Sequence, residues 1–275
     1  MTGHITPGGI APAVPVLSMF DQVHIGADEF GASVHMKVIY KNLLAAGEPG
    51  GGKSSLLALF AAHAALSQRS RLVLFDGKLV ELGFYKQVAD EFVGPDIGHA
   101  IITLRRLQAV LNNRCAWLEA RQRRKVEPAD GLTTITSIFD EIALYSTVLG
   151  TDQQQREFLT LFRDLVARGR AAAMPVIAAT QRPSVDIIPK SLRDLFGYRA
   201  AFRCTSDGSS DIILGDGWSG KGFTATDIPP TNQGLCHLIA EGGTPRRVKV
   251  AYLTDDHIIG LAALASSIRS GHAAA

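Results

Sequence analysis

Short runs of consecutive apolar residues alternate along the chain with longer segments in which apolar residues recur every three or four positions. The short runs predict buried strands, and the longer segments predict helices with one apolar face. We expect strands at residues 43–46, 71–75, 134–139, 176–180 and 198–204, and helices at residues 54–67, 101–125 and 153–170. The second helix is expected to end at Pro128 and Gly131. Strands that alternate with helices predict an α/β fold in which helices cover both faces of a mostly parallel sheet.

Two hairpins are expected outside this alternating core. Residues 23–34 combine alternating apolar positions with Gly26 and Gly31, and residues 235–240 are followed by a second strand pattern at 247–253. Strand patterns separated by a few turn-forming residues are typical of antiparallel hairpins.

The ends of the chain differ from this core in composition. Residues 1–20 are rich in Pro, Gly and Ala without the features of a signal peptide, so we expect a flexible tail there. We assign residues 21–262 to one domain and residues 263–275 to a second tail. The most apolar segment, 56–66, is too short to cross a bilayer about 30 Å thick, so no membrane span is expected.

Composition narrows the classes of function. The chain has 28 basic and 26 acidic residues, which excludes a strongly basic nucleic-acid binder and makes any polyanion contact local. Cys115, Cys204 and Cys236 are far apart in sequence, which argues against a zinc knuckle, a redox dithiol or a disulfide scaffold. A reducing cytoplasm fits this cysteine usage best.

A glycine-rich loop separates the strand at 43–46 from the helix at 54–67. Its residues are Gly47, Glu48, Pro49, Gly50, Gly51, Gly52, Lys53, Ser54 and Ser55. Gly47 and Gly52 let backbone N–H groups wrap a phosphate chain, Lys53 can reach the β and γ phosphates, and Ser54 can bind Mg²⁺. The alternative is an accidental glycine turn, and a second motif downstream argues against it.

That second motif is an acidic pair, Asp140 and Glu141, at the end of the strand at 134–139. Asp140 is placed to hold Mg²⁺, and Glu141 can polarise the water that attacks the γ-phosphate. The alternative is a solvated pair at the start of a helix. Thr136 and Ser137 make the strand unusually polar, which leaves its register open.

The remaining sequence favours an adenine nucleotide and its hydrolysis. No N-K-x-D motif for guanine recognition is present. Small-molecule kinases exclude water and generally lack a glutamate after the Mg²⁺ carboxylate, so Glu141 favours a hydrolase. We therefore expect an ATPase that binds ATP and Mg²⁺.

Three segments together resemble the motor domain of the FtsK/SpoIIIE DNA translocases. They are G-E-P-G-G-G-K-S at 47–54, F-D-E at 139–141 and A-T-Q-R-P-S-V-D at 179–186. The resemblance spans roughly residues 23–258 and includes L-F-D-G-K at 74–78. It implies a RecA-like, additional-strand P-loop fold. It also implies a homo-oligomeric ring, expected to be a hexamer, that moves double-stranded DNA.

The resemblance also implies roles for three further residues. Thr180 and Gln181 match the position at which the family senses the γ-phosphate. Arg170 aligns with the arginine that the family presents to the ATP of a neighbouring subunit. From the residues alone, Arg170 is equally well explained as part of a basic helix end stabilised by the helix dipole.

The segment 214–243 resembles the short FtsK-like transfer proteins of actinobacterial conjugative elements. The sequence has no match to the membrane spans or the winged helix of chromosomal FtsK. The resemblance therefore implies that any membrane association comes from a partner protein.

Two groups of basic residues are candidates for DNA contacts. Lys190 and Arg193 follow the Arg-Pro-Ser turn and are the preferred pair. A denser cluster near the end of the long helix is the second candidate: Arg114, Arg121, Arg123, Arg124 and Lys125. For both groups, solvated surface charge is the alternative.

Three functions stay open at this point. The leading hypothesis is an ATP-driven DNA translocase that serves plasmid or integrative-element transfer. A type VII or type IV secretion ATPase that moves protein would lack stimulation by DNA. A module that binds ATP without turnover would release no phosphate, but the intact set of Lys53, Asp140 and Glu141 argues against it.

Overall fold

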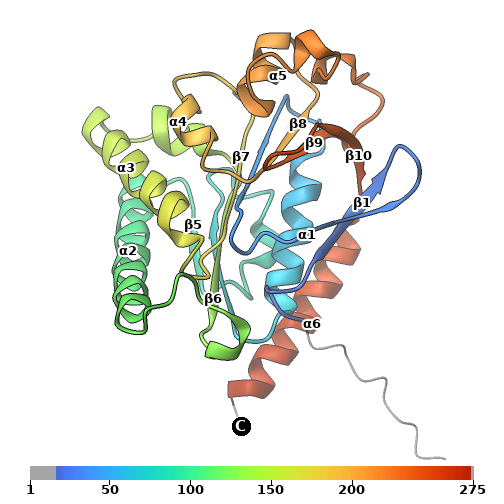
Figure 1. Ribbon diagram of the computed structural model, residues 1–275. Helices are drawn as coiled ribbons and strands as arrows, with labels where there is room; N and C mark the ends of the chain where they lie inside the picture. The colour runs from blue at the N-terminus through green and yellow to red at the C-terminus, as the bar shows by residue number, and fades with distance from the viewer. Residues whose placement is uncertain (1–16, 274–275) are drawn as a thin grey trace, which may run out of the picture.

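The computed structural model describes residues 17–273, which form one ten-stranded sheet between two layers of helices (Figure 1). The strand order is β2-β1-β10-β9-β8-β3-β7-β6-β4-β5. Six strands are parallel: β3 (Leu43–Ala46), β4 (Ser70–Phe75), β5 (Glu91–Val93), β6 (Thr134–Phe139), β7 (Val176–Thr180) and β8 (Tyr198–Phe202). Four extend the sheet in antiparallel fashion: β1 (Val23–Asp28), β2 (Ser33–Met36), β9 (Leu235–Ala240) and β10 (Arg246–Val250). The predicted strands, both predicted hairpins and the mostly parallel sheet are confirmed.

The order of the central strands defines the subclass of the fold. β7 pairs with β3 on one side and with β6 on the other. The strand that precedes the glycine-rich loop is thus separated by one strand from the strand that carries Asp140. This inserted strand confirms the predicted additional-strand P-loop fold.

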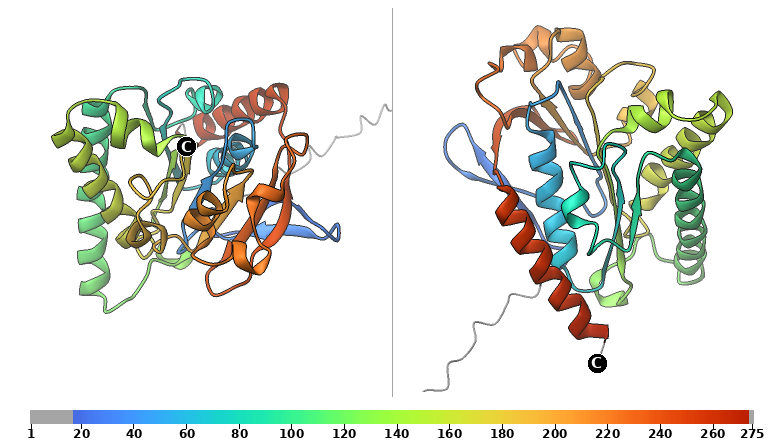
Figure 2. Two further views of the ribbon diagram at one scale, coloured as in Figure 1. Left: turned by 90° about the horizontal axis from the view of Figure 1, so that it is seen from above. Right: turned by 180° about the vertical axis from the view of Figure 1, so that it is seen from behind.

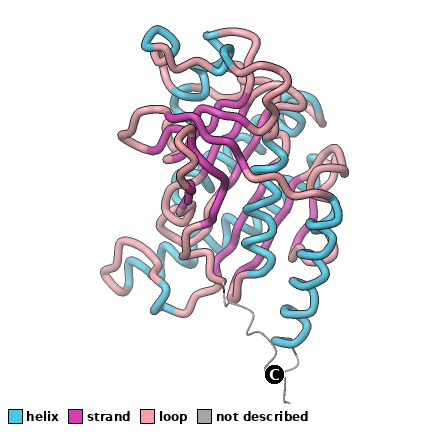
Figure 3. Tube along the Cα trace, turned by 90° about the vertical axis from the view of Figure 1, so that its right-hand side faces the viewer, coloured by secondary structure: helices cyan, strands magenta, loops and turns pink. Residues whose placement is uncertain are grey.

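Helices cover both faces of the sheet. α1 (Lys53–Leu66) and α6 (Asp255–Ala273) pack side by side on one face, as Figure 2 (right) and Figure 3 show. The other face is covered by α2 (Ile97–Ala120), α3 (Asp152–Gly169), the short α4 (Lys190–Arg193) and α5 (Asp207–Leu214). Each layer has its own apolar cluster, so the sheet is buried on both sides.

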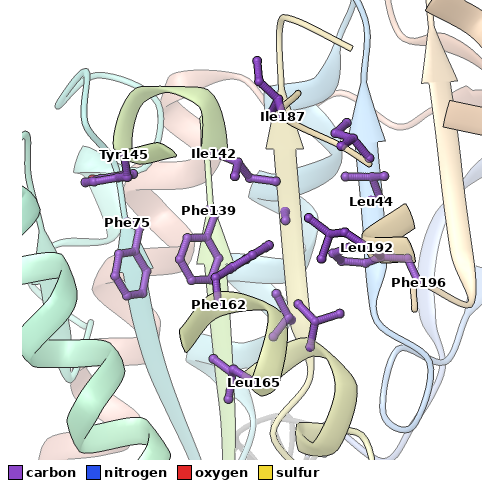
Figure 4. Packing of buried hydrophobic residues seen from close by; sticks show 14 of the residues in the cluster. Leu44, Phe75, Phe139, Ile142, Tyr145, Phe162, Leu165, Ile187, Leu192 and Phe196 are labelled. Atoms are coloured by element: carbon purple, nitrogen blue, oxygen red, sulfur yellow. The ribbon is translucent and has the colours of Figure 1, made fainter. Parts of the chain in front are cut away.

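Buried aromatic rings hold the two strands that end at the acidic residues. Phe75 of β4 stacks on Phe139 of β6 with 4.1 Å between ring centroids, and Phe162 of α3 meets Phe139 edge-on at 4.9 Å (Figure 4). Truncating one such ring to alanine costs about 3–5 kcal/mol. Because Asp76 and Asp140 directly follow Phe75 and Phe139, this packing fixes the backbone positions of both acidic residues.

The boundaries of α2 differ from the predicted helix at 101–125. Asp96 caps the helix by accepting a 3.0 Å hydrogen bond from the backbone N–H of His99, so the helix begins at Ile97. It ends at Ala120, because Gln122 adopts a left-handed backbone with φ of 52°. Pro128 instead opens a separate 3₁₀ turn, so the predicted helix end at Pro128 and Gly131 is wrong.

Part of each predicted tail belongs to the folded structure. Residues 263–273 continue α6 where a tail was expected, and Ala265 is fully buried. Arg269 anchors this part of α6 by donating to the carbonyl oxygens of Ala65 and Ser70, each at 3.0 Å, and by pairing with Asp90 at 2.9 Å. At the other end Met19 is already buried, while residues 1–16 lie outside the described residues. The domain therefore extends beyond 21–262 at both ends.

Candidate nucleotide-binding site

The glycine-rich loop lies at the carboxyl end of β3 and is tied to both neighbouring strands. Gly47 N–H donates to the carbonyl oxygen of Thr180 at 3.3 Å, and Glu48 N–H donates to that of Arg203 at 2.8 Å. The side chains of Glu48 and Arg203 also form an ion pair at 2.5 Å. These contacts fix the loop at the edge where ligands of open α/β sheets bind.

Two glycines in this loop occupy positions that no other residue fits. Gly47 has φ of 147°, and a Cβ there would lie 2.7 Å from the carbonyl oxygen of Phe202. Gly52 has φ of 105°, and its Cβ would lie 2.5 Å from the backbone of Gly234. The loop therefore depends on glycine for its shape, as a backbone cradle for phosphates does.

Lys53 is held inside the cradle. Its side chain is buried, and Nζ donates to the carbonyl oxygens of Gly47 and Glu48 at 2.8 and 2.7 Å. Burial lowers the pKa of Lys53 to about 8, although the nearby charge of Glu141 raises it. The backbone of the loop thus holds the ammonium group of Lys53 at the start of α1.

Asp140 has a carboxylate oxygen that receives no hydrogen bond from the described residues. Its residue is 4% exposed, and Oδ2 accepts no hydrogen bond from any residue between 17 and 273. Lys78 Nζ lies 3.5 Å from this oxygen. Burial raises the pKa of Asp140 to about 7, while the charge of Lys78 lowers it. An unsatisfied buried carboxylate oxygen at this edge of the sheet fits an oxygen-ligated divalent cation such as Mg²⁺. The predicted Mg²⁺ ligand Ser54 directly follows Lys53 in α1.

Glu141 is held more firmly than Asp140. Its Oε1 accepts from the Thr180 hydroxyl at 2.6 Å and from Ala143 N–H at 3.2 Å, and its Oε2 accepts from Gln181 N–H at 2.9 Å. Both acidic residues are buried, so a solvated helix-start pair does not describe them. The structure brings Thr180 and Gln181 to Glu141, and their role as γ-phosphate sensors stays a prediction.

The loop after β4 contributes residues that sequence reasoning left without a role. Asp76 is fully buried and accepts hydrogen bonds from the backbone N–H groups of four residues: Lys78, Leu79, Glu81 and Leu82, at 2.8–3.1 Å. This folded turn carries Lys78 to Asp140. The available signal was the acidic-glycine-lysine turn at the end of a strand. No comparable signal marked Arg203.

Arg170 lies at the opposite edge of the sheet from the chain's own glycine-rich loop. Its Nε donates to the carbonyl oxygen of Tyr40 at 2.6 Å, just before β3 begins, and its guanidinium pairs with Glu241 at 3.4 Å. It therefore cannot act on a nucleotide bound by the same chain, and its predicted role toward a neighbouring subunit stays a prediction.

The two residues preferred as DNA contacts differ in how exposed their side chains are. Arg193 is 5% exposed and pairs with Asp194 at 2.9 Å and with Asp216 at 3.1 Å. Its buried and paired charge makes Arg193 a weaker candidate than Lys190, and its contact with DNA stays a prediction. The Lys190 side chain is 69% exposed and pairs with Asp216 at 3.0 Å, so its contact with DNA stays a prediction.

The second basic cluster is also largely engaged. Arg114 donates to the carbonyl oxygens of Ala172 and Thr133, and Arg123 pairs with Glu127 and Asp130. The other three side chains follow: Arg121 lies over Trp117, Lys125 lies over Tyr40, and Arg124 is exposed. This cluster mainly supports the turn after α2.

The strand order, the glycine cradle and the two buried carboxylates together define a P-loop ATPase of the additional-strand class. The chain belongs to the FtsK/SpoIIIE family, whose profile matches residues 16–215. Among the described residues, no helix combines the length and the apolar character that a membrane crossing requires.

Curated relatives support the family assignment. The DNA translocase FtsK of Treponema pallidum (strain Nichols) is 28% identical over 231 residues, which cover 78% of this chain and 27% of that protein. The DNA translocase FtsK of Chlorobaculum tepidum is 31% identical over 189 residues, covering 63% of this chain and 23% of that protein. The chain thus spans about a quarter of the length of these relatives.

Solved structures support the fold. The pCW3 conjugation coupling protein TcpA, in a monomer form with ATPgS, superposes with a TM-score of 0.77 at 19% identity over 93% of this chain and 75% of that one. ATPases 2 and 3 of EssC from Geobacillus thermodenitrificans superpose with a TM-score of 0.74 at 13% identity, over 96% of this chain and 51% of that one. At these identities the likeness concerns the fold alone.

Proposed function

We propose that this chain is an ATP-driven motor that moves double-stranded DNA. The observation that carries the proposal is the anchoring of Glu141 by Thr180 and Gln181 beside Lys53 and Asp140, in a chain of the FtsK/SpoIIIE family. A nucleotide-binding module without turnover has no need of a carboxylate held in this way. The site is therefore built for hydrolysis.

Each residue of the site has a distinct task in the proposed reaction. The loop N–H groups and Lys53 bind the phosphates of ATP, and Ser54 and the free Oδ2 of Asp140 hold Mg²⁺. When bound, Mg²⁺ neutralises charge that develops on the phosphates. Glu141 keeps an unused lone pair on its oxygens with which to orient the attacking water and accept its proton.

The position of Arg170 supports a ring. An arginine that stabilises charge in the transition state must reach the phosphates, and this one lies at the far edge of its own sheet. Head-to-tail packing in a closed ring, with six subunits as our expectation, would bring Arg170 of one subunit to Lys53 of the next.

A mixing experiment tests this arrangement. Lys53→Ala chains lack a functional cradle but keep Arg170, and Arg170→Ala chains have the converse defect. We expect each variant alone to be inactive and their mixture to recover phosphate release, since one type of mixed interface is intact. A mixture as inactive as its components, although it assembles, would contradict action between subunits.

Membership of the FtsK/SpoIIIE family supports DNA as the load. A chain with a formal charge of only +2 is compatible with this load, because several subunits of a ring share the phosphate contacts. The test is phosphate release with and without linear duplex DNA, alongside the molar mass in solution. We expect duplex DNA to stimulate turnover and to promote oligomers.

The fold likeness to a conjugation coupling protein supports a role in conjugative plasmid or integrative-element transfer. We place the chain in the cytoplasm, associated with the membrane through a partner protein. The type VII secretion ATPase EccC of Thermomonospora curvata, with a TM-score of 0.68, keeps protein transport as the second candidate. Turnover that responds to a secreted protein and not to DNA would favour that candidate.

A further inference from the structure

Three apolar side chains beside the glycine-rich loop are exposed to solvent. Val80 and Phe84 lie in and after the turn that follows β4, and they are 65% and 37% exposed. Tyr252, from the segment between β10 and α6, is 72% exposed. The 3₁₀ turn that contains Phe84 (Gly83–Tyr85) contacts both α1 and α6, so these segments meet over the start of α1 (Figure 2, left).

These side chains border a groove that opens directly from the phosphate cradle. The groove has a volume of about 180 Å³ and is lined by Ser54, Ser55, Val80, Phe84 and Tyr252, among others. A second hollow of about 240 Å³ shares Ser55 and Tyr252 with it and also borders Gly52. Tyr252 therefore stands between two hollows that both begin at the first turn of α1.

The chemistry of ATP suggests what fills this groove. Lys53 and the carboxylates of Asp140 and Glu141 mark where the terminal phosphates lie, and Ser55 lies beyond them on α1. The rest of the nucleotide must leave the cradle along a neighbouring surface, and its flat base gains most from aromatic and apolar contacts. We propose that Tyr252 and Phe84, with Val80, clamp the base of the bound nucleotide.

The edge of the groove favours a base with an amino group. Glu81 and Asp255 both line it, and no hydrogen bond within the described part of the chain engages either carboxylate. An ionised carboxylate only accepts hydrogen bonds, so it pairs with the exocyclic amino group of adenine and repels the carbonyl oxygen that hypoxanthine carries there. This clamp rests on the proposed ATPase function and adds base recognition to it.

Binding of two ligands to the purified protein in the presence of Mg²⁺ distinguishes the contacts with the base from the contacts with the phosphates. We expect Tyr252→Ala and Phe84→Ala each to weaken ATP binding about 10-fold, since stacking on an aromatic side chain is lost. Binding of inorganic tripolyphosphate, which has no base, is expected to stay unchanged, and Tyr252→Phe is expected to bind ATP normally. Phe30→Ala, which removes an aromatic ring that is 87% exposed in the β1–β2 turn, is the matched control.

The outcomes are distinguishable. Unchanged ATP affinity in both alanine variants overturns the clamp, and so does an equal loss of ATP and tripolyphosphate affinity, because a base contact cannot affect a ligand without a base. A wild-type chain that binds neither ligand overturns the proposed function itself. Inosine triphosphate tests recognition of the amino group. We expect it to bind more weakly than ATP, and we expect Asp255→Asn to reduce the difference in affinity between the two nucleotides. Equal wild-type affinity for the two nucleotides would refute recognition of the amino group.

Discussion

Two buried charged side chains, Arg193 and Asp140, differ in how fully the protein pairs them. Around Arg193, every charge has a partner: the buried guanidinium pairs with Asp194 and Asp216, and Lys190 pairs with Asp216 as well. At the carboxyl edge of the sheet, Asp140 is equally enclosed, yet its Oδ2 accepts no hydrogen bond from the described residues.

The difference distinguishes structural from functional charge. Enclosing a charge is costly unless it is paired, so a stable fold completes such pairs wherever it can. The cluster around Arg193 follows this rule and locks α4 to the segment after α5. At the edge around Asp140, the ion pair with Lys78 at 3.5 Å leaves Oδ2 without a hydrogen-bond donor, and we assign this place to the proposed Mg²⁺. The predictions below test this contrast from the larger expected effects to the smaller ones.

The largest effect is expected at the glutamate beside the unsatisfied carboxylate. Glu141→Gln keeps the shape of the side chain but removes its ability to accept a proton, so kcat for ATP hydrolysis should fall about 1,000-fold. ATP binding should persist, as titration calorimetry can measure. A variant that hydrolyses ATP at the wild-type rate would remove Glu141 from the reaction.

Arg193→Ala should act on stability and leave catalysis intact. The substitution removes a buried side chain together with its ion pairs, and we expect it to lower the free energy of unfolding by about 2 kcal/mol. Denaturant unfolding measures the loss, and kcat of the folded variant should match the wild type. A catalytic defect without a loss of stability would contradict the structural role of this cluster.

Thr180→Val should produce a smaller catalytic effect. Valine preserves the volume of this buried residue but loses the 2.6 Å hydrogen bond to Glu141. We expect kcat to fall about 10-fold while KM stays constant, because the group that is misplaced acts in the chemical step. Thr180→Ser restores the hydroxyl and should recover most of the activity. A rise in KM alone would show that Thr180 serves binding instead.

Lys190→Ala should have the smallest effect, and it should appear only with DNA. If this exposed lysine contacts a phosphate, the substitution weakens duplex binding for all sequences and lowers the salt dependence of log K by about one unit. Lys37→Ala, at another exposed lysine of the chain, is the control. Identical salt slopes for the wild type and both variants would exclude the contact.

The sequence predicts most of the fold because its elements are encoded locally. A short segment of sequence is enough to recognise each apolar strand, the glycine spacing and the Asp140-Glu141 pair. Their places in the sheet follow from α/β topology. The predicted C-terminal end of α2 is wrong because the helix stops before a left-handed backbone conformation at Gln122, a residue type that gives no strong stop signal. The missed part of α6 is anchored by Arg269 to carbonyl oxygens about two hundred positions away in the chain, which no local pattern reveals.

The sequence predicts which residues form the site but reveals less about the hydrogen bonds between them. Motif positions identify Lys53, Asp140, Glu141 and Thr180, but the hydrogen bond that joins Thr180 to Glu141 depends on neighbouring strands. The pairing of Arg193 with Asp216, 23 positions later, is likewise not visible in the sequence. Charge in a sequence locates a candidate, and only its partners in the fold show whether that charge is free.

Displacement of a third strand from a duplex tests the proposed motor most directly. A fluorescent triplex-forming strand is placed at one end of a linear duplex, and its release is followed after ATP is added. We predict release that depends on ATP and on duplex length for the wild type, with none for Glu141→Gln. A wild-type protein that hydrolyses ATP in the presence of this duplex and leaves the third strand bound would contradict translocation along DNA.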